Sequence, residues 1–202
     1  MRTLRAALGA LLFLILLAGP LDAYALIYAE DYYELYHRHL NQSTDDIMEN
    51  IIWLERALST DFRNPLYALG RVETAEQWAR YRALFLMHVN LELTKLYRSF
   101  GSKYQKMTAY FFNYPWKRQN LESLDTAETL YRQAYYYWSQ ARQVAAEAWT
   151  MRSQRLEGLE AWVTEDFRIV TGALDYQKIL DSDLRKIQKV RADFQSMGAG
   201  TY

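Results

Sequence analysis

The sequence predicts an all-α fold in which a long antiparallel, coiled-coil-like helical hairpin carries shorter helices at both ends. Three observations predict it. The 202 residues include only three prolines and eight glycines, the two residue types that helices tolerate least. Through two long stretches, apolar residues recur every three or four positions, which is the period of a helix seam. No stretch shows the strict apolar–polar alternation that is typical of a half-buried strand.

The first 25 residues have the layout of a secretory signal peptide. Arg2 and Arg5 give a positive start, and residues 6–19 form an apolar run that Pro20 ends. Ala23-Tyr24-Ala25 then supplies the small-x-small pattern that signal peptidase recognises. We therefore expect cleavage after Ala25 and a protein that is periplasmic or secreted. An uncleaved signal anchor is the alternative interpretation.

The rest of the chain is predicted to form one helical domain over residues 26–197, followed by a flexible tail over residues 198–202. Without residues 1–25 it has 22 basic and 23 acidic residues, a net charge of −1. This balance leaves no basic excess to neutralise a phosphate backbone, so nucleic acid is not an expected partner. We also expect no strong membrane association after signal cleavage. The chain has no cysteine, which excludes disulfides and thiolate metal sites.

Two short helices are predicted before the hairpin. Residues 27–40 form the first one and are rich in tyrosine and charge. Ser43 and Asp46 resemble a capping box that starts the second helix, and this helix ends before Asp61. A short connection that begins with Asn64-Pro65 follows it, because such pairs favour turns.

The first arm of the hairpin is predicted from Thr74 to about Phe112, with Gly101 as its only glycine. A bend at Gly101 and a straight helix are both compatible with the sequence. Asn90 either fixes the register of the seam or lies exposed where the seam shifts. The apolar stretch at residues 83–89 indicates burial from two sides. The seam consists of Ala79, Ala83, Leu86, Asn90, Leu93, Tyr97, Phe100, Tyr104, Met107 and Phe111.

The second arm is predicted to begin at Asp125, an N-cap with Glu128 three residues later, and to run to about Glu157. An alanine at every seventh residue lets the partner helix approach closely. The predicted seam consists of Leu124, Ala127, Tyr131, Ala134, Trp138, Ala141, Ala145 and Ala148. A link of about ten residues makes the two arms antiparallel. A last helix is predicted over residues 174–196.

Candidate chemistry is sparse, and we expect neither catalysis nor a bound cofactor or metal. Glu34 and His37 have the i, i+3 spacing of two ligands on one helix face, although a solvated polar face explains them as well. His88, within the apolar stretch, is interpreted as a core histidine. Glu165 and Asp166 are interpreted as ordinary first-turn acids. The sequence contains no nucleophile elbow, no glycine-rich phosphate loop and no His-Glu-x-x-His motif.

Aromatic residues are the most unusual feature, because the chain has 17 tyrosines and six tryptophans. Three tyrosines are consecutive and point in three directions around one helix, so they cannot all face one partner helix. Tyrosine is enriched at protein–protein interfaces. The predicted interface residues are therefore Tyr32, Tyr33, Tyr36, Tyr110, Tyr135, Tyr136 and Tyr137. The alternative is that other helices of the same chain cover them.

Two resemblances to known families come from short segments. The segment from Asn64 to Gly70, together with Ala, Tyr and Trp at helix-packing positions, resembles tetratricopeptide repeats. The segments 53–69, 131–138 and 174–180 resemble small exported helical proteins of spirochaetes, a group that includes components of the periplasmic flagellar collar. The second resemblance implies a periplasmic location, a role in assembly and helical partners. Neither resemblance carries over a catalytic residue.

The predicted function is a non-enzymatic structural or scaffold role in the periplasm that mediates protein–protein assembly. The resemblance implies the spirochaete flagellar motor collar as the assembly. Expected partners are other proteins of an envelope-associated assembly, in an oligomer or hetero-complex. The alternative is a periplasmic helical binding protein that holds a small apolar or lipidic ligand, with His88 and Asn90 as the polar groups of an aromatic pocket.

Overall fold

The computed structural model describes residues 27–106 and 111–200, and this part of the chain is helical without a strand. The predicted all-α fold is confirmed. Two short 3-10 helices, η1 (Pro65–Tyr67) and η2 (Phe111–Trp116), accompany six α-helices. The α-helices are α2 (Ala29–Gln42), α3 (Ile47–Leu58), α4 (Ala75–Tyr104), α5 (Lys117–Thr150), α6 (Glu160–Val170) and α7 (Tyr176–Ser196).

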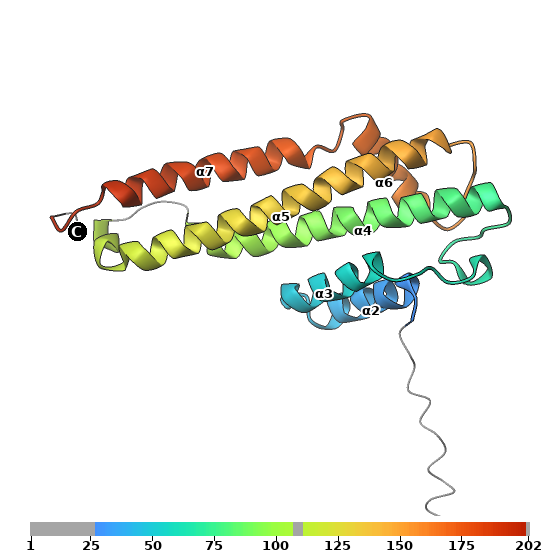
Figure 1. Ribbon diagram of the computed structural model, residues 1–202, viewed down its shortest axis with the longest axis horizontal. Coiled ribbons are helices and arrows are strands. Elements are labelled where there is room, and N and C mark those ends of the chain that lie inside the picture. Colours follow the sequence, from blue (N-terminus) through green and yellow to red (C-terminus); the bar gives the residue numbers. More distant parts are fainter. Residues whose placement is uncertain (1–26, 107–110, 201–202) are drawn as a thin grey trace, which may run out of the picture.

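The helices form three layers around a central hairpin (Figure 1). The hairpin consists of α4 and α5, which run antiparallel and side by side. At 1.5 Å per residue, their 30 and 34 residues make arms of about 45 and 51 Å. α6 and α7 follow one another along one side of α5, and the α2–α3 pair packs on the other side, against α4. α6 also contacts α4 and reaches α2, where the rings of Trp162 and Tyr33 have centres 5.7 Å apart, so the hairpin separates the α2–α3 pair from α7 but not from α6.

The contact between the two arms is made close by small residues. The structure buries every residue of the α5 seam: Leu124, Ala127, Tyr131, Ala134, Trp138, Ala141, Ala145 and Ala148. α4 continues through Gly101 to Tyr104, and a Cβ at Gly101 would lie 2.7 Å from the Tyr131 ring. Gly101 is therefore a close-approach position that admits the Tyr131 ring.

Gly101→Ala is expected to destabilise the protein by about 1–3 kcal/mol, the usual cost of overpacking a filled core. Helix propensity alone predicts the opposite sign, a gain of about 1 kcal/mol. Urea unfolding followed by circular dichroism measures the change, and Ser102→Ala at the exposed neighbouring position is the control. A more stable Gly101→Ala variant would show that the Tyr131 ring moves aside without cost.

The middle of α4 is buried from more than one side, as its apolar stretch predicts. Six of the seven residues from Ala83 to Val89 are buried, and α4 contacts α3, α5 and α6. Asn90 is also buried, and its side-chain amide donates to the carbonyl oxygen of Leu86 at 2.7 Å. The alternative of an exposed Asn90 is therefore wrong. Among the described residues, this side-chain hydrogen bond stays within α4, so it does not fix the register of α4 against a partner helix.

The expected boundaries of both hairpin arms need correction. α4 ends at Tyr104 instead of Phe112, and Met107 lies outside the described residues. α5 begins at Lys117, so Asp125 is not an N-cap and instead pairs with Arg191 of α7 at 2.7 Å. The earlier start is explained by α7, which extends alongside this first part of α5 and buries its Leu124.

The other end of α5 is also shorter than predicted. The helix stops at Thr150 instead of Glu157. The guanidinium of Arg80, on α4, donates to the carbonyl oxygens of Arg152 and Gln154, which belong to the turn after α5. These bonds satisfy backbone acceptors that a continued helix would use itself, so they favour the turn.

The start of α3 differs from the expectation as well. Asp46 is the N-cap, and its Oδ1 accepts from the backbone N–H of Glu49 at 3.1 Å. Ser43 is the C-cap of α2, and its carbonyl oxygen, not its side chain, accepts from the backbone N–H of Asp46 at 3.1 Å. The predicted signal peptide lies outside the described residues. Across residues 27–106 and 111–200, no helix combines the length and the apolar character that crossing a membrane requires.

Candidate functional site

The predicted interface tyrosines divide into three groups. Tyr33, Tyr36 and Tyr137 are buried in the core, so the expectation that they face a partner protein is wrong. Helices of the same chain cover them, as the alternative interpretation held. Tyr32 stacks on Trp53 at 6.3 Å, and both Tyr32 and Tyr135 are half-buried. Only Tyr136 is well exposed, at 54 %, and Tyr110 lies outside the described residues.

Glu34 and His37, the two predicted metal-ligand candidates, have other contacts. The Glu34 carboxylate accepts from the Arg63 guanidinium at 3.0 Å. His37 packs edge-on against the ring of Tyr33, with 4.5 Å between ring centres. The structure therefore does not bring Glu34 and His37 together as a site.

A buried polar network joins α2, α4 and α6 around His88. Its Nε2 lies 2.8 Å from the Tyr33 hydroxyl, and its Nδ1 lies 2.5 Å from Glu165 Oε2. The imidazole also stacks on Trp162 of α6, with 5.0 Å between ring centres. His88 is thus a core histidine with both ring nitrogens hydrogen-bonded, as expected. Glu165 is no ordinary first-turn acid, because it lies mid-helix and pairs with a residue 77 positions earlier.

Lys95 supplies the countercharge of this network. Its ammonium lies 2.5 Å from Glu92 Oε1 and 3.5 Å from Glu165 Oε1. Burial alone would raise the pKa of Glu165, but the hydrogen bond from His88 and the charge of Lys95 outweigh it and lower the pKa. The pKa of Tyr36 is raised, mainly by burial and to a smaller extent by the negative charge of Glu92. The Tyr36 hydroxyl donates to Glu92 at 3.3 Å. One lysine thus pairs with both carboxylates of the network, which clamps three helices together.

Asp166, the neighbour of Glu165, occupies a different environment. Its side chain is fully buried on α6, and neither carboxylate oxygen has a hydrogen-bond partner in the described residues. Burial raises its pKa to about 6, and the positive charge of Arg80 opposes the shift only in part. The expectation of an ordinary first-turn acid is wrong here too, because α6 turns this residue toward α4.

The most exposed apolar side chains lie in the loop between α3 and α4. Leu66 is 83 % exposed and Tyr67 is 69 % exposed, and both belong to η1. The side chain of Asn64 accepts from the backbone N–H of Leu66 at 3.0 Å, which caps the turn. We name residues Pro65–Tyr67 the apolar loop. Sequence analysis missed it as a site, although two large apolar residues directly after an Asn-Pro turn are a usable signal.

The apolar loop is held on both sides. Before it, the backbone N–H of Arg63 donates to Glu30 Oε2 at 2.9 Å, and the Arg63 guanidinium pairs with Asp31 and Glu34 of α2. After it, the backbone N–H of Arg71 donates to the carbonyl oxygen of Glu157 at 3.1 Å. These anchors come from α2 and from the turn before α6, so the loop has a fixed position.

A cleft of about 410 Å³ opens where α5 meets the turn between α6 and α7. Trp138 forms part of its lining, is buried, and has an indole N–H without a hydrogen-bond partner in the described part of the chain. Neither His88 nor Asn90 lines this cleft. Its other lining residues include the apolar Ile169, Val170 and Leu174 and the charged Arg142, Asp175, Lys178 and Asp181.

A comparison with protein-family models matches residues 76–197 to the Domain of unknown function (DUF8513). The chain belongs to this family. Comparisons with curated proteins and with solved structures gave no match.

The DUF8513 match begins in the first turn of α4 and ends one residue after α7. It therefore contains the hairpin, α6 and α7, while the α2–α3 pair and the apolar loop precede it. The His88 network spans both parts, because Tyr33 and Tyr36 come from α2. This network ties α2 to the DUF8513 region, and the hydroxyls of Tyr97 and Tyr137, which donate to Glu55, tie α3 to it.

Proposed function

We propose that this protein is a non-enzymatic scaffold of the periplasm that holds partner proteins of an envelope-associated assembly. The observation that carries the proposal is the apolar loop, which presents Leu66 and Tyr67 to solvent from a fixed position. The resemblance to exported spirochaete proteins makes the periplasmic flagellar motor collar the assembly that we propose to test first.

A preorganised apolar contact is well suited to protein recognition. Binding a flexible loop costs the entropy of ordering it, and a loop that is already fixed avoids most of that cost. Tyrosine offers a large apolar area with a polar hydroxyl, which is why it is common at the centres of interfaces. Leu66 and Tyr67 combine these properties at one site.

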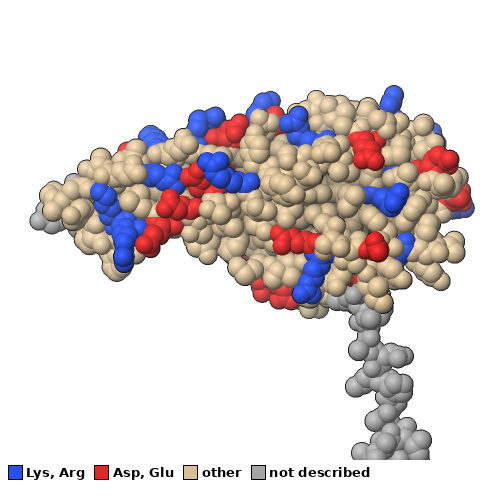
Figure 2. Space-filling view, viewed as in Figure 1, with Lys and Arg blue, Asp and Glu red and all other residues tan. Residues whose placement is uncertain are grey.

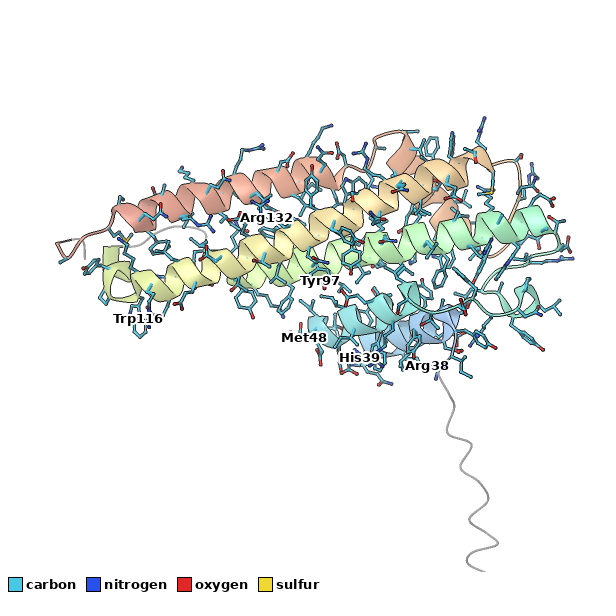
Figure 3. The ribbon with its side chains drawn as sticks, in the orientation of Figure 1. Arg38, His39, Met48, Tyr97, Trp116 and Arg132 are labelled. Atoms are coloured by element: carbon cyan, nitrogen blue, oxygen red, sulfur yellow. The ribbon has the colours of Figure 1, made fainter. Side chains whose placement is uncertain are left out.

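The rest of the molecule supports a structural role. The titratable groups that the fold gathers around His88 are paired with one another across α4 and α6. On the face seen in Figure 2, acidic and basic side chains are interspersed without a large area of one sign. Exposed apolar side chains occur elsewhere too, including Trp116 at the hairpin tip, which projects away from the ribbon in Figure 3.

The test compares the wild-type chain with the double variant Leu66→Ser/Tyr67→Ser in the native cell envelope. Mild crosslinking, purification and mass spectrometry are expected to recover a fixed set of envelope proteins with the wild type and to lose that set with the double variant. Both residues are exposed, so the melting temperature should not change. Tyr136→Ser, at the exposed tyrosine of α5, is the matched control and should retain the set.

Two outcomes would contradict the proposal in different ways. If Tyr136→Ser loses the partners and the loop variant keeps them, the scaffold contacts its partners through α5 and the loop is not the site. If the wild type is recovered alone as a monomer, the scaffold role itself is wrong.

A second candidate function is ligand binding in the cleft beside Trp138. Its volume of about 410 Å³ lies within the range of small-molecule sites. The charged residues Arg142, Asp175 and Lys178 in its lining suit a polar ligand better than the lipidic one that the sequence analysis considered. Native mass spectrometry of the purified protein would show a bound small molecule if this function holds.

A further inference from the structure

Three potential metal ligands meet at the turn that joins α2 to α3. His39 lies in the last turn of α2, Asp46 is the N-cap of α3, and Glu49 lies in the first turn of α3. One ligand atom from each residue lies within 4.8 Å of those of the other two. Asp46 uses only Oδ1 to cap the helix, which leaves Oδ2 for another partner. Figure 3 shows His39 in the α2–α3 layer.

The separation of two of these atoms already matches metal coordination. A tetrahedral zinc ion with ligand bonds of about 2.0–2.1 Å holds its ligand atoms about 3.4 Å apart. His39 Nε2 and Glu49 Oε2 are 3.3 Å apart. The Glu49 side chain is 43 % exposed, so an ion can enter from solvent.

A residue outside this group orients the imidazole. Asn50 is fully buried, and its Oδ1 lies 3.0 Å from His39 Nδ1. An amide oxygen at this position makes Nδ1 the protonated nitrogen, so that Nε2 turns a lone pair toward the carboxylate of Glu49. Metal-binding histidines commonly donate their other ring N–H to such an oxygen. Either a proton on Nε2 or a metal ion can occupy the space between this nitrogen and the Glu49 carboxylate, and the 3.3 Å separation suits both.

The His88 network is a similar arrangement that contains a lysine. There, His88, Glu92 and Glu165 also lie within ligand distance of one another, but Lys95 pairs with both carboxylates. Among the described residues, neither Asp46 nor Glu49 forms an ion pair with a lysine or an arginine. The cluster at the α2–α3 turn thus has the ligands of a cation site without a lysine or an arginine between them, and its ion pair in the described residues joins His39 and Glu49.

We propose that His39, Asp46 and Glu49 bind one divalent transition-metal ion of the zinc class. One imidazole nitrogen and two carboxylate oxygens suit zinc or cobalt better than calcium or magnesium, which prefer oxygen ligands throughout. Three protein ligands leave a fourth position for water or for a group from a partner. The ion would bridge α2 and α3 and close the turn between them. This site differs from Glu34 and His37, which the sequence analysis weighed.

The experiment is calorimetric titration of the full chain, purified without a histidine tag, with zinc chloride. The wild type is expected to bind one zinc ion per chain. His39→Gln and Glu49→Gln each remove a metal ligand. Loss of a residue that only hydrogen-bonds a ligand weakens metal affinity by about 10- to 100-fold, so each of these variants should weaken zinc affinity by more than that. His37→Gln and Asp45→Asn, which alter neighbours outside the cluster, are matched controls and should bind as the wild type does.

Thermal unfolding gives a second readout. Zinc should raise the melting temperature of the wild type and of both controls, because a ligand that binds only the folded state stabilises it, and it should not raise that of Glu49→Gln. Because Glu49 is partly exposed, this variant tests the site even if His39→Gln fails to fold. Equal zinc affinity in the wild type and Glu49→Gln, or no zinc binding by the wild type, would overturn the proposal.

Discussion

Arg63→Ala is expected to lower the free energy of unfolding by about 3–5 kcal/mol, the usual cost of removing one partner of a buried ion pair. Asp31, its partner on α2, has a side chain that is only 4 % exposed. Burial would lower the pKa of Arg63, but the hydrogen bonds and charges of Asp31 and Glu34 outweigh it and raise the pKa. Without the guanidinium, α2 would retain a buried carboxylate with no countercharge from Arg63.

The same helix provides the control for this prediction. Arg38 pairs with Glu34 at 3.9 Å, but its own side chain is 73 % exposed. An exposed ion pair contributes about 0–1 kcal/mol, so Arg38→Ala should leave stability nearly unchanged. Urea unfolding measures both variants. Similar losses of unfolding free energy in the two variants would show that burial does not make the Arg63 ion pair more important for stability.

Arg63→Ala should also loosen the apolar loop, since Arg63 directly precedes its cap, Asn64. Hydrogen exchange of the backbone amides of Leu66 and Tyr67 is expected to become faster than in the wild type, while that of the α5 seam changes only with global stability. This connects the ion pair to the proposed function. A loop that stays protected in the variant would show that the Arg71–Glu157 side is sufficient to hold it.

Asp166→Asn is expected to stabilise the protein by about 1–3 kcal/mol at pH 7.5 and by much less at pH 4. In the folded state its pKa is about 6, against an ordinary value of 3.8. The folded state therefore binds this proton more tightly, and the stability that Asp166 contributes is lost as the pH rises through about 6. A shift of about two units corresponds to about 3 kcal/mol at most. Asparagine removes the charge that causes this loss.

Urea unfolding of the wild type and Asp166→Asn at both pH values tests this prediction, because the difference between the two proteins isolates Asp166 from other titrating groups. Glu160→Gln is the control on the same helix. Glu160 is exposed, and its pKa is lowered by hydrogen bonds from its own backbone N–H and from that of Gly158, so this variant should show no gain at pH 7.5. A stability difference for Asp166→Asn that is independent of pH would contradict the assignment of a raised pKa.

Local sequence patterns determined the helical character of this protein and much of its helix order. The last helix was expected over residues 174–196, and α7 spans Tyr176–Ser196. The alanine spacing also identified a buried face of α5, whose first half clusters with α7 and whose second half clusters with α4. Both succeed because the spacing of apolar residues along one helix decides which face can be buried, whatever lies opposite.

Helix boundaries and polar pairs were decided by the tertiary structure. α5 starts eight residues before Asp125 because α7 packs against its first part, and α5 stops at Thr150 where Arg80 binds the carbonyls of the following turn. His88 and Glu165 meet across 77 residues. No local pattern contains these contacts, because each depends on where a distant helix lies.

For the tyrosines, too, the sequence determined one property and the tertiary structure decided another. The sequence by itself determined that the surplus is too large for one helix seam, and it left open whether partners or other helices cover the rest. The fold buries Tyr33, Tyr36 and Tyr137 and leaves Leu66 and Tyr67 as the most exposed apolar pair. Composition and period specify how much apolar surface must be covered, whereas the packing of segments far apart in the chain specifies which residues are covered. That packing is a property of the tertiary structure alone.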